Sequence, residues 1–229
     1  METTMIHVTT KIERASEQTI QGLGAFSAAT IHEAQGRRGA LASTIKPIDR
    51  DSRFIGSAFT VVCAPRDNLM LQIAIHFAKP GDVLIVGAGG FPEAGMFGDV
   101  LGNACKAKGI VALVTDSGVR DTVELRELGL PVFSGSVSIK GTVKETLGYI
   151  NQPLVFGDET IRPGDIVKGD ADGIVIVRRE EGDKVIALSQ ARDESEAGLI
   201  EQYKLGRTTI DLCNLSAVLK AKGLTTDLD

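Results

Sequence analysis

The chain has 229 residues, 43% hydrophobic and 24% charged, which is enough to build a hydrophobic core of its own. A formal net charge of -5 and an aromatic content of 4% without tryptophan argue against a protein that binds nucleic-acid backbones or stacks on single-stranded bases. The three cysteines are scattered, and no apolar run approaches the roughly 18 residues of a membrane span. We therefore expect a cytoplasmic protein whose cysteines are small core residues.

Helix and strand patterns alternate up to residue 133. They predict helices over 15–26, 31–36, 69–78, 99–108 and 122–128, and strands over 56–64, 83–86, 110–114 and 131–133. This alternation is typical of parallel βαβ units. Short strands are then expected at 137–141, 154–156, 160–161 and 173–177, followed by a helical tail from residue 183 with an amphipathic stretch over 210–219. Because no linker interrupts the pattern, we expect a single domain over residues 1–229.

The pair Arg120-Asp121 gives the strongest indication of chemistry. It follows the apolar stretch 110–114 and a glycine-bearing segment that we interpret as a loop leading into the next helix. Ligands of open α/β sheets bind beyond the carboxyl ends of the strands, where such a loop would lie. A guanidinium beside a carboxylate suits an anionic keto acid held on a divalent metal. A capping box formed by Asp121 and Glu124 is an equally good structural interpretation.

A second glycine-rich loop, Gly95-Met-Phe-Gly-Asp99, leads into the helix expected from residue 99. The first amides of a helix point outward and carry partial positive charge, so those of residues 98–101 could hold a small carboxylate. Asp99 would then lie at the edge of the site, as a metal ligand or as a holder of water. From spacing alone, a simple helix N-cap is the favoured interpretation of Asp99.

Two other groups are weaker candidates. Gly87-Ala-Gly-Gly90 follows a strand, but the third glycine of a dinucleotide fingerprint is replaced and Asp116, the available acid, lies too far along the chain. Glu33, Arg37 and Arg38 fit a solvated ion-pair face, with the binding of a distal substrate carboxylate as the alternative.

Lysine-based and histidine-based chemistry find little support. A Schiff-base aldolase would use Lys140 or Lys168, but neither has an evident desolvating or cationic neighbour that would lower its pKa. The three histidines share no metal-ligand spacing. A general base is therefore expected to be a water or hydroxide instead of an imidazole.

Five short motifs are distributed over most of the chain: HEAQGRRGA at 32–40, GGFPEAG at 89–95, GDVL at 98–101, TDSGVRD at 115–121 and GDADG at 169–173. Together they resemble the 4-hydroxy-4-methyl-2-oxoglutarate / 4-carboxy-4-hydroxy-2-oxoadipate aldolases, whose superfamily includes the regulator of ribonuclease E activity A. The resemblance implies a swivelling β/β/α sandwich that assembles as a homotrimer or homohexamer, with the tail from about residue 183 packed on a neighbouring subunit. It also implies a class II, metal-dependent pyruvate aldolase.

The resemblance also implies roles for individual residues. Asp121 would bind Mg²⁺ or Mn²⁺ directly, and Arg120 would bind the keto acid. The amides of Gly98, Asp99, Val100 and Leu101 would hold the pyruvyl carboxylate, while Asp99 and an adjacent subunit's Glu196 would hold metal-bound waters. Arg120 and Asp99 would be the catalytic pair.

The implied reaction is retro-aldol cleavage of 4-carboxy-4-hydroxy-2-oxoadipate to pyruvate and oxaloacetate, and of 4-hydroxy-4-methyl-2-oxoglutarate to two pyruvates. Oxaloacetate decarboxylation would be a side activity, and the pathway would be aromatic ring-cleavage catabolism such as protocatechuate degradation. The expected partners are the keto-acid substrate and further copies of the chain, with no nucleic acid or membrane. The alternative is a non-catalytic, protein-binding trimer similar to the ribonuclease E regulator.

Overall fold

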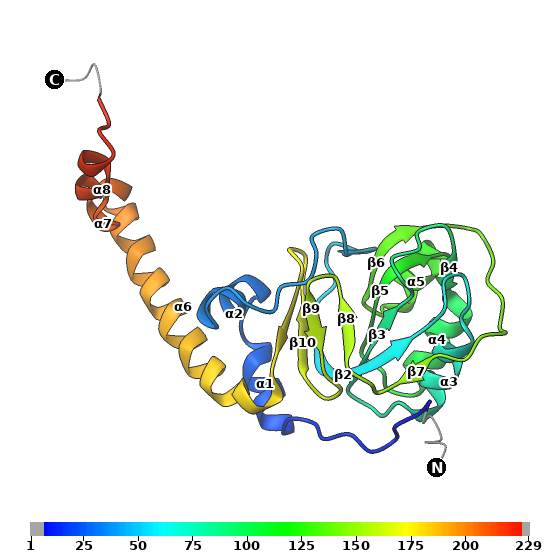
Figure 1. Cartoon of the computed structure of the whole chain (residues 1–229). Helices are drawn as coiled ribbons and strands as arrows, with labels where there is room; N and C mark the ends of the chain where they lie inside the picture. The colour runs from blue at the N-terminus through cyan, green and yellow to red at the C-terminus, as the bar shows by residue number, and fades with distance from the viewer. Residues whose placement is uncertain (1–6, 226–229) are drawn as a thin grey trace, which may run out of the picture.

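The computed structural model describes residues 7–225, so any prediction for residues 1–6 and 226–229 lies outside the described part. A mixed sheet forms its body (Figure 1). Its strands are β1 (Lys46–Pro47), β2 (Phe54–Val62), β3 (Asp82–Gly87), β4 (Gly95–Phe97), β5 (Ala112–Val119), β6 (Val132–Val137), β7 (Tyr149–Ile150), β10 (Ile166–Gly169) and β11 (Ile174–Val177). The order across the sheet is β1-β6-β5-β3-β2-β10-β11, with β4 beside β5 and β7 beside β2. β8 (Leu154–Phe156) and β9 (Glu159–Ile161) form a separate antiparallel pair.

Eight α-helices lie within the described residues. They are α1 (Glu17–Gly24), α2 (Ala28–Ala34), α3 (Leu69–Phe77), α4 (Asp99–Ala107), α5 (Thr122–Leu128), α6 (Gly182–Lys204), α7 (Thr209–Leu212) and α8 (Leu215–Ala221), with a 3₁₀ turn, η1, at Arg179–Glu181 before α6. In that part of the chain, no helix combines the length and apolar character that a membrane crossing requires.

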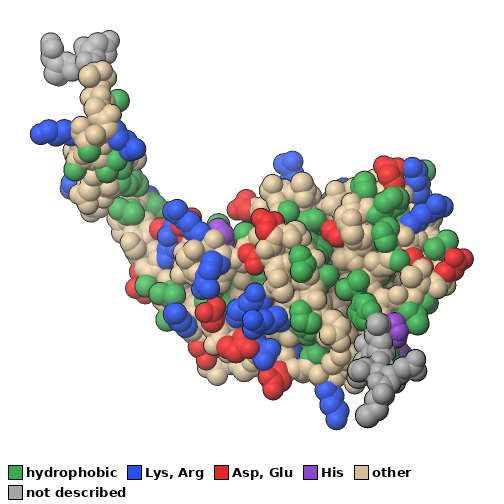
Figure 2. All heavy atoms as spheres, in the orientation of Figure 1, with side chains coloured by type: hydrophobic (Ala, Val, Ile, Leu, Met, Phe, Trp, Pro, Cys, Tyr) green, Lys and Arg blue, Asp and Glu red, His purple; other side chains and the backbone are tan. Residues whose placement is uncertain are grey.

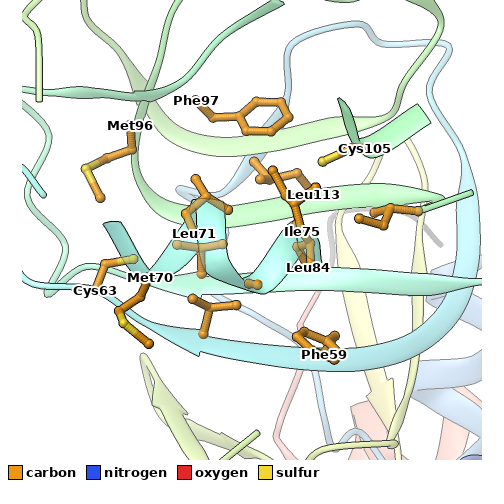
Figure 3. Packing of buried hydrophobic residues seen from close by; sticks show 14 of the residues in the cluster. Phe59, Cys63, Met70, Leu71, Ile75, Leu84, Met96, Phe97, Cys105 and Leu113 are labelled. Carbon is orange, nitrogen blue, oxygen red and sulfur yellow. The ribbon is translucent and has the colours of Figure 1, made fainter. Parts of the chain in front are cut away.

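The central strands are buried on both faces, and alternate residues belong to different cores. In β3, Leu84 and Val86 pack with α3, α4 and α5, whereas Val83 and Ile85 pack with β8, β9, β10 and β11. Figure 3 shows the first of these cores, where Leu71 of α3 and Phe97 of β4 approach the sheet. Because strand side chains alternate between faces, a continuous apolar run such as β3 must be covered on both sides.

A third core lies on the outer face of β10 and β11. The helices α1, α2 and the beginning of α6 cover it, with Leu23, Ile31 and Val185 fully or almost fully buried. Beyond this contact, α6 leaves the body as an arm that carries α7 and α8 at its end (Figure 1). The sheet therefore curls between two helical layers, α3–α5 on one side and α1, α2 and α6 on the other.

Most of the predicted elements are confirmed, including the parallel pairing of β2, β3, β5 and β6. Four predictions are wrong. The glycine-rich stretch expected as a loop over 95–99 begins with a strand, because Gly95–Phe97 form β4 beside β5. The segment after residue 114 is not a loop, because β5 continues to Val119 with a register shift against β6 between Thr115 and Gly118. The strand expected over 137–141 is mostly loop, and the amphipathic stretch 210–219 is broken between α7 and α8, where Asn214 has a positive φ.

The cysteine prediction holds for two residues of three. Cys63 and Cys105 are buried in the first core, and burial raises the pKa of each thiol to about 12. They are therefore unreactive packing residues at neutral pH. Cys213 was also expected in the core, but it is exposed on the arm.

An ion pair fixes the N-terminal segment to the sheet. Asp82, at the start of β3, is fully buried and accepts from Nε and Nη2 of Arg14 at 2.7 and 2.8 Å. We expect Arg14→Met to lower the free energy of unfolding by about 3 kcal/mol, because it leaves a buried carboxylate without its cation. Urea denaturation measures this. The double variant Arg14→Met/Asp82→Asn should lose less free energy of unfolding than Arg14→Met alone. An equal or greater loss in the double variant would contradict the explanation.

Candidate functional site

A pocket of about 320 Å³ lies where β4, β5 and the loop after β6 meet the amino-terminal end of α4. It is lined by Asn68, Gln72, Gly95, Met96, Gly98, Asp99, Val100, Leu101, Arg120, Asp121, Gly141, Thr142 and Lys144. The two sequence motifs predicted to meet, GDVL and TDSGVRD, therefore come together in one cavity. The two motifs are distant in the sequence, and the pairing of β4 with β5 brings them together in space.

The backbone places Arg120 and Asp121 at this pocket. Arg120 donates its amide to the carbonyl of Phe97 in β4 at 2.9 Å, immediately after β5 ends. Asp121 then adopts a left-handed conformation, with φ 55° and ψ 43°, that turns the chain into α5. Aspartate and asparagine tolerate this conformation better than most residues. The turn thus explains why a short polar side chain stands here.

Gly98 is required by the close approach of Asp121. A Cβ at position 98 would lie 2.2 Å from Oδ2 of Asp121, which no real contact allows. At Gly95, an added Cβ would lie 2.5 Å from the carbonyl oxygen of Ser138 and 3.1 Å from Cβ and Cδ of Arg120. Gly98 therefore provides space for the Asp121 carboxylate, and Gly95 provides space for the backbone of the loop after β6 and for the aliphatic part of Arg120.

The charged pair remains accessible to a ligand. Nε of Arg120 lies 3.5 Å from Oδ2 of Asp121, and the two side chains are 46% and 35% exposed. A pair with this exposure is weakly held, so its cation and carboxylate can each bind another group. Asp121 makes no side-chain bond to α5 and instead accepts the amide of Asp99 at 3.3 Å. The capping-box interpretation with Glu124 is therefore wrong.

The amino-terminal end of α4 differs from its prediction in one respect. Gly98 occupies the N-cap position and Asp99 is the first helical residue, so the N-cap interpretation of Asp99 is wrong. The Asp99 carboxylate accepts the amide of Val100 at 2.7 Å. Two of the four predicted carboxylate-binding amides, those of Asp99 and Val100, are thus bonded to carboxylates in this structure, and a bound anion would replace these bonds.

Four further polar or cationic residues at the pocket were missed by sequence reasoning. Asn68 precedes α3 but does not cap it with its side chain; its amide donates to the carbonyl of Met96 at 3.0 Å and its oxygen accepts from Gln72 at 3.1 Å. Thr142 and Lys144 come from the loop that follows β6. Lys144 gives the cavity a second cation beside Arg120. No local pattern marks this loop as part of a site, because tertiary contacts alone bring it there.

Asp67 holds that loop in place. It is buried, and its carboxylate accepts the amides of Leu69, Glu145 and Thr146 at 2.7 to 2.9 Å. Burial alone would raise its pKa, but the three backbone amides outweigh burial and lower the pKa below the ordinary value.

A pH dependence of stability follows from Asp67. Because the pKa is lower in the folded state, the contribution of Asp67 is complete above its unfolded pKa of about 4 and is lost as the pH falls through the folded value. We expect Asp67→Asn to destabilise the protein at pH 7 and to differ less from the wild type near pH 3. Urea denaturation at both pH values measures this. A stability difference between the variant and the wild type that is larger near pH 3 than at pH 7 would contradict this role of Asp67.

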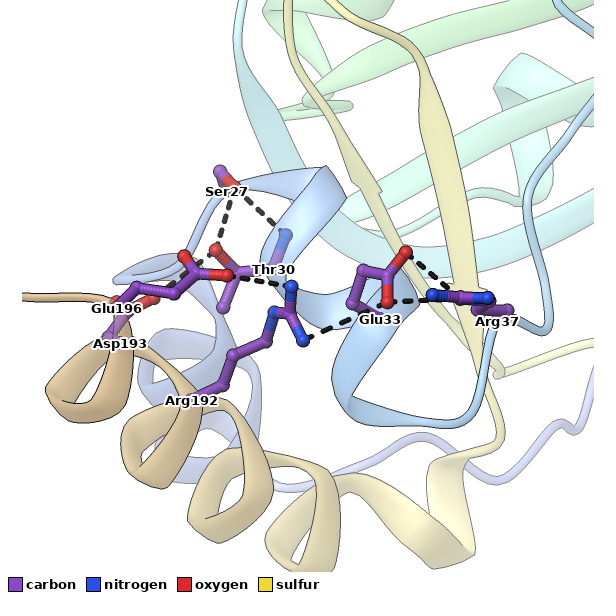
Figure 4. Close-up of polar contacts among 7 residues, drawn as sticks. All are labelled: Ser27, Thr30, Glu33, Arg37, Arg192, Asp193 and Glu196. Carbon is purple, nitrogen blue, oxygen red and sulfur yellow. Dashed lines mark hydrogen bonds and ion pairs between the residues drawn. The ribbon is translucent and has the colours of Figure 1, made fainter. Parts of the chain in front are cut away.

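Glu196, Glu33, Arg37 and Arg38 do not reach this pocket within one chain. Figure 4 shows Glu33 of α2 between Arg37 and Arg192, and Arg192 in turn bonded to Glu196 on α6. The distances are 3.1 Å for Glu33 to Arg37, 3.7 Å for Arg192 to Glu33 and 2.7 Å for Arg192 to Glu196. These charges fix α2 to α6, on the side of the body away from α4 and α5 (Figure 1).

Two other candidates have structural partners. Asp116 accepts the amides of Ala88 and Gly90 at 2.7 and 2.8 Å, so it already uses the loop amides that a dinucleotide phosphate would need. Lys140 is exposed and paired with Glu93.

The interpretation of Lys168 as lacking a desolvating or cationic neighbour is wrong. This residue is buried, and its pKa is lowered by burial and by Arg53, against the opposing effect of Asp170.

The donor set at the pocket fits a hydrated hard cation. Asp121 and Asp99 both line the pocket and offer carboxylate oxygens to it. Mg²⁺ is usually held by one or two carboxylates and keeps several waters, so it does not need a dense protein cage. Within residues 7–225, three or more His, Cys, Asp or Glu side chains nowhere gather as a metal cluster. Asp121, with Asp99 beside it, is the position where such an ion fits.

Comparison with known proteins places the chain among its relatives. A family model described as RraA-like, Aldolase/RraA, matches residues 27–176. The chain belongs to the RraA-like family. The match includes β4, α4, β5 and the pocket residues that they carry, whereas α6, α7 and α8 lie beyond it.

Relatives of this RraA-like protein have diverse names. A putative 4-hydroxy-4-methyl-2-oxoglutarate aldolase of Halalkalibacterium halodurans is 35% identical over 158 residues, which cover 68% of this chain and 75% of the relative. RraAS2 of Streptomyces coelicolor, described as an unusual member of the RNase ES inhibitor RraA family, is 27% identical with a TM-score of 0.70, over 83% of this chain and 100% of that one. A Pseudomonas syringae protein of unknown role is 25% identical with a TM-score of 0.75, over 86% and 97%. Proteins similar to this chain are thus described as a putative aldolase and as a member of a ribonuclease inhibitor family.

Proposed function

We propose that this RraA-like protein is a class II pyruvate aldolase that cleaves 4-carboxy-4-hydroxy-2-oxoadipate and 4-hydroxy-4-methyl-2-oxoglutarate with Mg²⁺ or Mn²⁺. The observation that carries the proposal is the meeting of Arg120, Asp121 and Asp99 in one pocket. A cation, an oxygen ligand and a second carboxylate are the groups that retro-aldol cleavage of an anionic keto acid requires. The 35% identical putative aldolase supports the same reaction class.

Arg120 would bind the C2 oxygen of the substrate, while the amides of residues 98–101 would hold its C1 carboxylate. When the C3–C4 bond breaks, its electron pair moves toward the C2 oxygen and produces an enolate of pyruvate. The guanidinium is positioned to donate hydrogen bonds to that developing negative charge. A divalent cation bound at Asp121 would supply Lewis-acid polarisation at the same oxygen.

Asp99 would handle the proton at the other end of the breaking bond. The C4 hydroxyl must lose its proton as the C4 carbonyl forms, and no histidine lines the pocket. The carboxylate of Asp99 lines the pocket, and within residues 7–225 its hydrogen bond is to the amide of its neighbour Val100, so it can orient a water that accepts this proton. Oxaloacetate decarboxylation would proceed through the same enolate.

The complete site would include a second copy of the chain. Glu196 lies on α6, and its side chain is 45% exposed beside Arg192. The arm beyond it carries exposed apolar residues among its charges, including Ile200, Leu205 and Ile210 (Figure 2). A trimer or hexamer in which the tail packs on a neighbour would cover such residues and bring Glu196 toward the waters around the cation of an adjacent pocket.

The proposed function is tested by a lactate-dehydrogenase-coupled assay of pyruvate release from both substrates. We expect turnover with Mg²⁺ or Mn²⁺ and none after chelation. Turnover that survives chelation but is stopped by borohydride would indicate a Schiff base and contradict the metal mechanism. Failure of both substrates with either metal would contradict the aldolase proposal.

The likeness to RraAS2 favours one second candidate, a ribonuclease-inhibiting trimer without turnover. It predicts a stable complex with a ribonuclease and no pyruvate release. Inhibition of a purified RNase E-type ribonuclease, measured with the same preparation that is assayed for pyruvate, separates the two functions.

A further inference from the structure

A second pocket, of about 410 Å³, lies where the start of β2 pairs with the end of β10. It is lined by Gly24, Ala25, Phe26, Ser27, Arg50, Asp51, Ser52, Arg53, Lys168, Asp170 and Ala171. None of these residues lines the pocket of Arg120 and Asp121. The second pocket therefore has its own chemistry, which the aldolase proposal leaves unused.

Lys168 is the unusual residue in this pocket. Only 7% of its surface is exposed, which is rare for a lysine. Its Nζ donates one hydrogen bond, at 3.0 Å, to the carbonyl of Gly24 at the end of α1. An ammonium has three N–H donors, and within residues 7–225 the other two have no protein acceptor. The carbonyl of Gly24 thus accepts one of the three Nζ hydrogens of Lys168, and the other two have no protein acceptor in the described part of the chain although the side chain is buried.

The surrounding charges favour an anion. Arg53 and Arg50 line the same cavity, and both are exposed. Two carboxylates, Asp51 and Asp170, also line the pocket; the oxygens of Asp170 accept the amides of Ala28 and Asp172, at 2.7 and 3.1 Å, and so are already bonded to backbone. Burial lowers the pKa of Lys168, and Arg53 lowers it further against the opposing effect of Asp170.

We propose that this pocket binds a small oxyanion, a carboxylate or a tetrahedral phosphate- or sulfate-type group, between Lys168 and Arg53. The anion would provide acceptors for the two remaining donors of Nζ and for the guanidinium fork of Arg53. Arg50 would add positive charge at the opening. A buried donor without an acceptor is unfavourable, because its hydration is lost and no hydrogen bond replaces it. That desolvation has already taken place in the folded protein, so an anion that accepts the two hydrogen bonds binds more tightly.

Isothermal titration of the full chain with sodium sulfate and with malonate tests the proposal, because the two probes separate a tetrahedral head group from a carboxylate. The titrations use an Arg120→Met/Lys144→Met background, which removes the cations of the first pocket. We expect one anion per chain, with the tighter probe identifying the class of head group. Arg53→Met should weaken binding by roughly tenfold, the effect of losing a charge-assisted hydrogen bond. Lys168→Met should weaken it further.

Arg162→Met is the matched control, because Arg162 is exposed on the turn before β10 and lines neither pocket. The Arg162→Met variant should bind the anion with the same affinity as the Arg120→Met/Lys144→Met protein in which it is made. A second measurement avoids replacing the buried lysine. Acetic anhydride labelling read by mass spectrometry should show Lys168 protected by the bound anion, while the exposed Lys108, which follows α4, is labelled equally with and without it. The proposal is overturned if neither probe binds in a way that depends on Arg53, or if Lys168 is not protected.

Discussion

Replacing Arg120 by methionine should lower kcat/KM for pyruvate release by roughly 10³-fold, the effect of removing a preorganised donor from a developing oxyanion. Methionine keeps an unbranched, apolar side chain beside Gly95 and Gly98 but has no donor. The ion pair with Asp121 is half exposed and contributes little to folding, so the free energy of unfolding should change by less than about 1 kcal/mol. The coupled pyruvate assay and urea denaturation measure both quantities on one preparation.

Arg126→Met provides the matched control for Arg120. Arg126 lies one turn into α5 and donates to the carbonyl of Thr122 in its own helix, outside the pocket. Its replacement should leave kcat/KM within about twofold of the wild type, because surface substitutions away from a site have small effects. Arg120→Lys should also lose most activity, since an ammonium cannot present the planar two-donor face of a guanidinium. An Arg120→Met protein with near-normal kcat would remove Arg120 from the mechanism.

The sequence is informative about the fold where residue patterns are periodic. The apolar runs of β3 and β5 and the spacing of α3, α4 and α5 predict their elements to within a few residues, because each element must bury one face or two. No bounds for β10 follow from the sequence, because the four residues after a Pro-Gly turn carry too little pattern; the strand is defined by its pairing with β2 and β11. The end of β5 was predicted too early because Thr115 to Gly118 are small and polar, although they lie beneath a covering loop.

For the site, local sequence located the charges but not their contacts. The motifs TDSGVRD and GDVL placed Arg120, Asp121 and Asp99 at loop-to-helix junctions, and the pairing of β4 with β5 brings them together. The cap interpretations failed because capping rules consider only the helix that follows a residue in the sequence. The Asp121 carboxylate instead accepts the amide of Asp99 at the start of α4, which is a different helix. Lys144 and Lys168 were beyond the reach of any local pattern, since the position of one and the burial of the other depend on distant segments.

Asp121→Asn should abolish turnover, with a loss of at least roughly 10³-fold, and should also remove the response of the protein to divalent metal. Asparagine tolerates the left-handed backbone at φ 55°, and its amide oxygen can still accept the amide of Asp99. The fold should therefore persist while the negative charge is lost. For the wild type, saturating Mg²⁺ or Mn²⁺ should raise Tm by mass action, whereas the variant should show no metal-dependent shift. Differential scanning calorimetry with and without metal measures this independently of activity.

Two comparisons make the Asp121 result specific. Asp158→Asn, in the exposed turn between β8 and β9, removes the same charge outside the pocket and should keep both turnover and the metal-dependent rise in Tm. Asp99→Asn should weaken turnover but retain part of the metal response, because Asp99 is proposed to act through waters and Asp121 to bind the ion directly. If instead Asp99→Asn removes the metal response and Asp121→Asn preserves it, the two carboxylates have exchanged roles. If both variants keep it, the ion binds elsewhere and the proposed assignment of Asp121 fails.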